Sequence, residues 1–154
     1  MGKFLGLDYG KVRIGIAVSD PNASVAFGRE VILNDKNSFT RLKKLLEDEG
    51  ITSIILGLPL SLKGEKTQQT ILTESFEQEL RKKLDSFGGN FADINIIKWD
   101  ERFTSSLEID SMLSSGMKKK NRQKKENIDI ISAALLLQSY LDNRKHKLMQ
   151  NDQE

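Results

Sequence analysis

The sequence contains no cysteine, and this absence excludes disulfide bonds and thiolate metal ligands. It fits a reducing compartment. No apolar run approaches the roughly 20 residues that a membrane-spanning helix needs. Asp8 interrupts the N-terminal residues too early for the apolar core of a signal peptide. We therefore expect a soluble protein of the cytoplasm.

An excess of charge of one sign is also lacking, because 24 Lys and Arg side chains balance 22 Asp and Glu to a formal net charge of +2. The basic residues are nevertheless unevenly placed, with a cluster in residues 118–125. Such a cluster can bind a polyanion on a nearly neutral protein, but it is equally compatible with a solvated loop. The cluster consists of Lys118, Lys119, Lys120, Arg122, Lys124 and Lys125.

No repeat, low-complexity linker or break in composition divides the 154 residues. This length corresponds to one domain, since domains commonly have roughly 100–200 residues. We expect a single domain over residues 1–142 and a polar, frayed tail over residues 143–154.

Hydrophobic periodicity predicts strands and helices in a mixed order. The expected strands are residues 4–9, 12–19, 26–33, 53–58 and 94–99. The expected helices are residues 37–49, 67–87, 105–113 and 128–141, with a basic loop over residues 116–126. A hairpin joins the first two strands through Gly10 and Lys11. Gly50 is expected to end the first helix, and Ser105 with Glu108 forms a capping-box pattern at the start of the third.

Three strands followed by alternating helices and strands indicate an α/β fold. We expect a mixed sheet in which an antiparallel meander continues into parallel strands, with helices on both faces. The ribonuclease H-like fold has this order of elements, and so does each half of the actin-like ATPase fold. The order alone does not choose between them.

Asp8 stands near the end of the first expected strand and shares a face with Phe4 and Gly6, because side chains alternate along a strand. A carboxylate on the core side of an apolar strand is costly unless something compensates its charge, as a divalent metal would. The alternative is a turn aspartate that accepts hydrogen bonds from its own backbone.

Asp100 and Glu101 directly follow the last expected strand, at the edge where open α/β sheets place their sites. Neighbouring side chains point to opposite faces, so we do not expect the two acids to share one metal ion. The alternative is an exposed, charged strand end in which Arg102 pairs with one acid.

Asp129 is expected in the first turn of the helix over residues 128–141. Acids are favoured there by the helix dipole and the free N–H groups alone. Asp129 also shares a face with Ala133, Leu136 and Tyr140, so the alternative is a metal ligand at the top of a buried face.

The three acids lie at two strand ends and one helix start, an order that allows them to converge. Oxygen ligands suit Mg²⁺ or Mn²⁺ rather than zinc. Two such ions about 4 Å apart can activate a water and stabilise the leaving oxygen of a phosphodiester. His146 is the single histidine, and we interpret it as a surface residue.

The segment from Gly57 to Gly64 leads from a strand to a helix, and helix N-termini bind phosphate readily. Its spacing fits neither the Walker A nor the dinucleotide pattern. An ordinary connecting loop is therefore the simpler interpretation of this segment.

Four segments together resemble the YqgF/RuvX family of pre-16S rRNA nucleases and Holliday-junction resolvases. They occur in the order that the family has and span nearly the whole chain. Two positions depart from the family pattern, since Ser61 stands where Asn is frequent and Phe103 where Leu is usual. The segments are LGLDYGKVRIGIAVSD, LGLPLSLKG, DERFTSS and KKENIDIISAALLLQSYLD.

The resemblance implies a ribonuclease H-like fold and a nuclease that needs Mg²⁺ or Mn²⁺. It assigns the family's three acids to Asp8, Glu101 and Asp129, choosing Glu101 over Asp100. It also implies maturation of the 5′ end of small-subunit ribosomal RNA. We expect substrate contacts from Arg102, Lys118, Lys119, Lys120, Lys124 and Lys125.

Three alternatives stay open at this point. A resolvase of branched DNA would normally act as a symmetric homodimer, whereas a processing nuclease can be a monomer. A non-catalytic nucleic-acid-binding module would retain the basic cluster without needing three convergent acids. An actin-like ATPase would need a second domain, for which this chain is too short.

Overall fold

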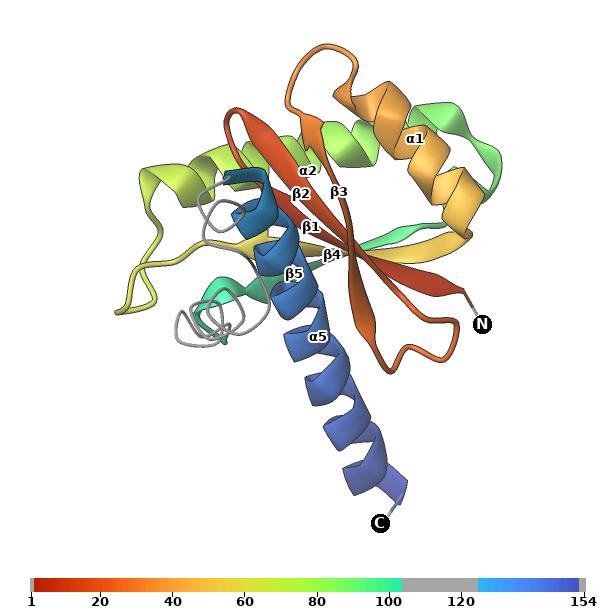
Figure 1. Ribbon diagram of the computed structural model, residues 1–154, viewed down its shortest axis with the longest axis vertical. Coiled ribbons are helices and arrows are strands. Elements are labelled where there is room, and N and C mark those ends of the chain that lie inside the picture. Colours follow the sequence, from red (N-terminus) through yellow and green to blue (C-terminus); the bar gives the residue numbers. More distant parts are fainter. Residues whose placement is uncertain (1, 104–124, 153–154) are drawn as a thin grey trace.

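Five strands form one mixed sheet in the spatial order β3-β2-β1-β4-β5 (Figure 1). The computed structural model describes residues 2–103 and 125–152. The strands are β1 (Lys3–Tyr9), β2 (Arg13–Ser19), β3 (Ala26–Leu33), β4 (Ile51–Leu58) and β5 (Asn95–Asp100). Each strand agrees with its expected position to within about two residues at either end.

Strand β1 lies in the middle of the sheet, antiparallel to β2 and parallel to β4. Strand β5 continues the parallel part beside β4, and β3 continues the antiparallel part beside β2. In the β1–β2 hairpin, Asp8 lies opposite Gly15. The expected meander that continues into parallel strands is therefore confirmed.

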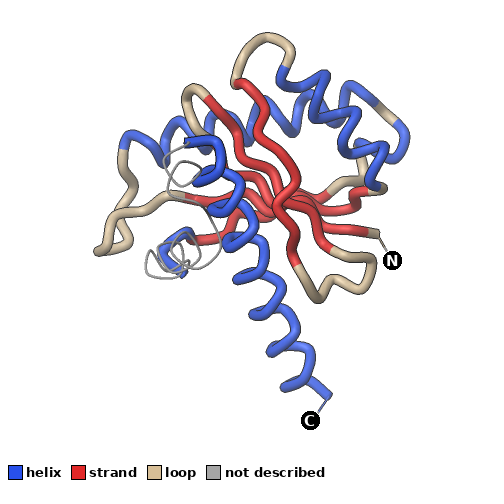
Figure 2. The backbone as a smooth tube through the Cα atoms, viewed as in Figure 1, coloured by secondary structure: helices blue, strands red, loops and turns tan. Residues whose placement is uncertain are grey.

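Two helices, α1 (Ser38–Glu49) and α2 (Gln68–Phe87), cover one face of the sheet (Figure 2). Gly50 ends α1 in the left-handed conformation, with φ of 65°, as the sequence predicts. Thr67 caps α2, and its hydroxyl accepts a hydrogen bond from the backbone N–H of Thr70. The side chains of both helices and the sheet form one apolar core, which includes Leu5, Leu7, Ile16, Leu42, Leu46, Ile54, Leu56, Leu80 and Leu84.

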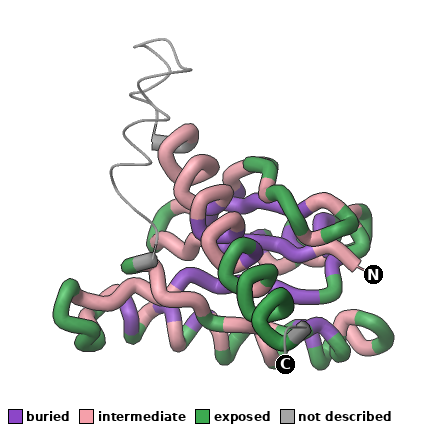
Figure 3. The backbone as a smooth tube through the Cα atoms, turned by 90° about the horizontal axis from the view of Figure 1, so that it is seen from below, coloured by how far each residue is buried: buried purple, intermediate pink, exposed green. Residues whose placement is uncertain are grey.

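One long helix, α5 (Lys125–Asp152), covers the opposite face and contacts β1, β2 and β3. A second apolar cluster fills this interface and contains Phe4, Ala17, Ile55, Ala133, Leu137 and Leu141. Helices thus lie on both faces, as expected, and the inner strands are the most buried part of the molecule (Figure 3). None of the helices in the two described ranges is long and apolar enough to cross a membrane.

The structure corrects the sequence-based description of α5 at both ends. The helix begins at Lys125, so Asp129 lies in its second turn rather than its first. Helix also continues through Asp152, so the expectation of a frayed tail from residue 143 is wrong up to that residue. The expected helix over residues 105–113 and the basic loop up to residue 124 lie outside the described residues.

Candidate active site

The structure brings Asp8, Glu101 and Asp129 together at one edge of the sheet. Asp8 is the second-last residue of β1, and Glu101 begins the short 3₁₀ helix η2 (Glu101–Phe103) directly after β5. The parallel strands β1, β4 and β5 all end at this edge, where α5 begins (Figure 1). The negative charges of Glu101 and Asp129 both act on the Asp8 carboxyl.

Two glycines allow the other acids to approach Asp8 so closely. A Cβ atom at Gly15 would clash with the backbone carbonyl of Asp129, so only glycine lets this turn of α5 lie against β2. A Cβ atom at Gly57 would lie 2.5 Å from Oε1 of Glu101, whose side chain passes over β4. Because Gly15 is the cross-strand partner of Asp8, the first approach places Asp129 beside Asp8.

Burial raises the pKa of two of the acids, and repulsion between negative charges adds to the effect. Loss of hydration by burial, the negative charge of Glu101, a hydrogen bond with Glu101 and the charge of Asp129 raise the pKa of Asp8 from 3.8 to about 8. Burial also raises the pKa of Glu101, and the hydrogen bond with Asp8 acts in the opposite direction. With a pKa of about 8, Asp8 keeps its proton at neutral pH and donates it in the hydrogen bond to Glu101.

Asp129 differs from the other two acids because it has a basic partner. The Nε atom of Arg13 donates a hydrogen bond to Oδ2 of Asp129 over 3.0 Å, and both side chains are about one quarter exposed. Arg13 begins β2 and lies two residues before Gly15, on the same face. This arginine fixes one carboxylate oxygen and leaves the other available to a ligand.

Asp100 differs from the other acids because Arg102 pairs with it, although its negative charge still contributes to the raised pKa of Glu101. Its carboxylate accepts hydrogen bonds from Nε and Nη2 of Arg102, with a shortest distance of 2.7 Å. These hydrogen bonds lower the pKa of Asp100. Arg102 is therefore the ion-pair partner of Asp100, and its Nη1 also donates to the carbonyl of Leu62 over 3.4 Å.

The donor set of this site fits a hard divalent cation. All three acids offer oxygen, and no lysine or arginine of residues 2–103 or 127–151 forms a salt bridge with Asp8 or Glu101. An ion would supply the positive charge that this half-buried pair lacks. In the side-chain positions of the described residues, no three His, Asp or Glu groups are arranged to surround an ion. Loading would therefore require loss of the Asp8 proton and a rotation of the carboxyl groups.

The predicted basic surface is mostly outside the part of the chain that the structure describes. Lys118, Lys119, Lys120 and Lys124 lie in residues 104–124. Lys125 is the first residue of α5, where the sequence predicts loop. Contacts of these five lysines with a substrate remain predictions.

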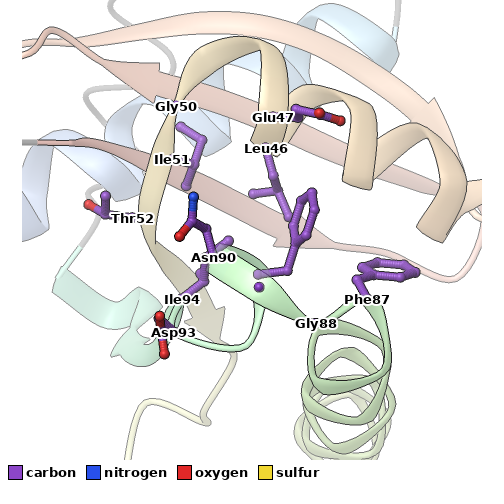
Figure 4. A pocket seen from close by; sticks show the side chains of 12 residues that line it. Leu46, Glu47, Gly50, Ile51, Thr52, Phe87, Gly88, Asn90, Asp93 and Ile94 are labelled. Atoms are coloured by element: carbon purple, nitrogen blue, oxygen red, sulfur yellow. The ribbon is translucent and has the colours of Figure 1, made fainter.

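A cavity of about 550 Å³ lies at the opposite edge of the sheet from the acids (Figure 4). It is bounded by the C-terminal ends of α1 and α2 and by the start of β4, and its lining includes Glu47, Ile51, Phe87, Phe91 and Asp93. None of the three convergent acids lines it. This cavity is therefore separate from the site that the three acids form.

Sequence reasoning missed Arg13, Gly15 and Gly57 as parts of the site. Strand alternation contained the signal for the first two, because residues on the same face of a hairpin as Asp8 follow from its register. The role of Gly57 could not be found in this way. It depends on the direction in which Glu101 leans after β5 ends.

Comparisons with known proteins agree with this architecture. A family model described as "RuvX: Holliday junction resolvase" matches residues 2–143. A protein named "Putative pre-16S rRNA nuclease" from a Sulfurihydrogenibium species is 46% identical over 142 residues, covering 92% of this chain and 91% of its own. A protein of the same name from Flavobacterium psychrophilum is 36% identical over 144 residues, covering 94% of this chain and 99% of its own.

Solved structures show the same fold at low sequence identity. RuvC of T. thermophilus in complex with a Holliday junction substrate is 12% identical, with a TM-score of 0.57, and the match covers 91% of this chain and 94% of that one. Fowlpox virus resolvase with Holliday junction DNA is 14% identical, with a TM-score of 0.54, covering 92% and 97%. The fold is thus ribonuclease H-like, and the chain belongs to the RuvX family.

Proposed function

We propose that this nuclease hydrolyses a phosphodiester bond of precursor ribosomal RNA, with divalent metal ions held by Asp8, Glu101 and Asp129. One observation carries the proposal: at the edge where β1 and β5 end, the charges of Glu101 and Asp129 both act on the Asp8 carboxyl, and no salt bridge within the described residues neutralises Asp8 or Glu101. Such an arrangement is costly for a folded protein. It is useful where a bound cation repays the cost, as in nucleases that use two ions.

The residues of the chain have distinct tasks in this proposal. Mg²⁺ or Mn²⁺, when bound, supplies water activation and stabilises charge on the leaving oxygen. Asp8, on the central strand, would hold such an ion once its carboxyl has lost its proton. Glu101 reaches over Gly57 toward the same point. Arg13 holds Asp129 through one carboxylate oxygen, and the other oxygen would be the one to hold an ion.

The names of the relatives support RNA as the substrate. If this assignment is right, the protein works in the cytoplasm with the ribosomal precursor. The lysines of residues 118–125 would bind the phosphate backbone, since they closely precede Asp129 in the chain. No second active site is needed for a single RNA strand, so a monomer suffices.

Resolution of branched DNA is the second candidate. The description of the family favours it, since it refers to Holliday junctions. A resolvase must cut two strands at symmetric positions, so it would require a homodimer with two sites. The two candidates therefore differ in substrate and in oligomeric state.

The two are separated by cleavage of three substrates side by side, with Mg²⁺ and with Mn²⁺. The substrates are precursor ribosomal RNA, unstructured RNA and a four-way DNA junction, and Asp48→Asn on the exposed side of α1 serves as a matched control. The proposal predicts cleavage of the precursor RNA that Asp8→Asn abolishes and Asp48→Asn preserves. Cleavage restricted to the junction would replace the RNA assignment with resolution, and no cleavage of any substrate would contradict both.

A further inference from the structure

The loop between β4 and α2, residues 59–67, carries an apolar side chain that touches almost nothing. Leu62 is 96% exposed, the highest value among the exposed large apolar side chains of the described residues. A single exposed leucine is common at protein surfaces. Its position is unusual in two respects, because turns normally carry polar residues and because Arg102, the residue after Glu101, contacts this turn.

The loop holds Leu62 in a fixed place. The backbone of Ser61 and Glu65 pairs over 2.9 Å, and the N–H of Gly64 donates to the carbonyl of Ser61 over 2.8 Å. The hydroxyl of Ser61 accepts a third hydrogen bond, from the N–H of Glu65 over 3.0 Å. Leu60 and Lys66 form a bridge at the base of the loop. Leu62 therefore stands at the tip of a small, hydrogen-bonded hairpin.

A second set of contacts ties this hairpin to the acids. Arg102 directly follows Glu101 and donates to the carbonyl of Leu62 over 3.4 Å. The guanidinium group lies against Gly64, where a Cβ atom would be 3.1 Å from Nη1. Asp100 fixes the same guanidinium group from the other side. The position of Leu62 relative to Glu101 is thus set by Arg102.

We propose that Leu62 is a wedge that inserts against the bases next to the scissile phosphate of an RNA strand. This inference rests on the proposed nuclease function and concerns the choice of cleavage site within it. Apolar side chains that enter a base step unstack it and bend the strand. A leucine that is 96% exposed in the described part of the chain gains burial when a substrate covers it. The exposed Lys63 beside it can meet the backbone of the same strand.

The wedge assigns a particular class of substrate to the site. At the boundary between an RNA duplex and a single strand, the last base step is still stacked. Contacts of Leu62 with the bases would offset the free energy needed to unstack that step. In a flexible single strand the bases are already apart, so the wedge contributes little. The protein should therefore favour a phosphodiester at such a boundary, and Leu62 should determine this preference.

The test compares the wild type with Leu62→Ala on two RNAs: a hairpin with a 5′ overhang, and an unstructured strand of the same length. We expect Leu62→Ala to lower kcat/KM roughly tenfold on the hairpin and less than threefold on the single strand. Leu62→Met should retain the wild-type ratio, because it preserves an apolar side chain of similar size. Leu148→Ala, at the distant end of α5, is the control for loss of an exposed leucine.

A second measurement does not depend on cleavage. 2-Aminopurine placed at the helix boundary of the same hairpin should brighten when wild-type protein binds without metal, because unstacking increases its fluorescence. Leu62→Ala should bind without this increase. Equal kcat/KM losses on both RNAs, or unchanged fluorescence with wild type, would overturn the wedge. Absence of cleavage on every RNA would contradict the proposed function instead, and the fluorescence would still decide the role of Leu62.

Discussion

Asp8→Asn should make the metal-free protein more stable at pH 8 and leave it unchanged at pH 4. In the folded protein the Asp8 carboxyl retains its proton up to about pH 8, whereas in the unfolded chain it loses it near 3.8. The folded state therefore holds a proton that the unfolded state lacks throughout this window. Wild-type stability falls as pH rises from about 4 to 8, and the asparagine variant lacks this contribution.

The size of the effect follows from the same shift. A rise from 3.8 to about 8 corresponds to about 6 kcal/mol at about 1.4 kcal/mol per pKa unit. Because this proton lies in the hydrogen bond from Asp8 to Glu101, less than half of this should be recovered, about 2 kcal/mol. For a domain of this size, about 2 kcal/mol corresponds to a rise in Tm of roughly 4–8 °C.

The assay is thermal unfolding of both proteins in a metal chelator at several pH values between 4 and 8. Acids away from the site titrate identically in the two proteins, so the difference in Tm reports Asp8 together with Glu101, whose pKa depends on it. Added Mg²⁺ should then stabilise the wild type and not the variant, since only a binding site for the ion shifts unfolding. A difference in Tm that stays constant with pH, or a variant less stable at pH 8, would refute the reasoning.

Three further perturbations test other parts of the site. Gly57→Ala should lower cleavage at least tenfold and cost about 1–3 kcal/mol of unfolding free energy, because its Cβ atom would lie 2.5 Å from Oε1 of Glu101. A cleavage assay and chemical denaturation measure the two effects. Wild-type activity would contradict the role of Gly57. Arg13→Gln should change the free energy of unfolding by less than about 1 kcal/mol, because the ion pair with Asp129 is partly exposed. The same variant should bind Mn²⁺ more weakly, as measured by titration calorimetry. Unchanged affinity would show that Arg13 is not part of the site. Replacing Lys118, Lys119 and Lys120 with alanine in an Asp8→Asn background should weaken RNA binding and flatten its dependence on salt; identical slopes by fluorescence anisotropy would leave the basic cluster without a role.

Much of the fold follows from the sequence because the period of apolar residues depends on local geometry. Strand β3 occupies the expected residues 26–33, and Gly50 ends α1 as expected. The length of α5 could not be predicted in the same way. Its last turns are polar, and a helix that extends beyond the sheet leaves no apolar periodicity in the sequence.

The sequence suggested the three acids of the candidate site, but not the residues Arg13, Gly15 and Gly57 that surround them. Alternation along the chain separates Asp100 from Glu101, and the structure shows Asp100 bound to Arg102 instead. The contact between Gly15 and Asp129 joins residues more than 100 positions apart. Such contacts depend on how α5 crosses the sheet, which no local pattern encodes. The division between a domain over residues 1–142 and a tail stays a prediction.

The most direct test of the central claim is single-turnover cleavage of 5′-labelled precursor ribosomal RNA in Mg²⁺. Asp8→Asn, Glu101→Gln and Asp129→Asn are each compared with wild type and with Asp48→Asn. The account predicts that each of the first three lowers the rate by roughly 100-fold or more, because groups that act as a unit fail together, while Asp48→Asn cleaves like wild type. Wild-type rates in any of the three acid variants, with folding intact, would contradict the assignment of that acid to the metal site.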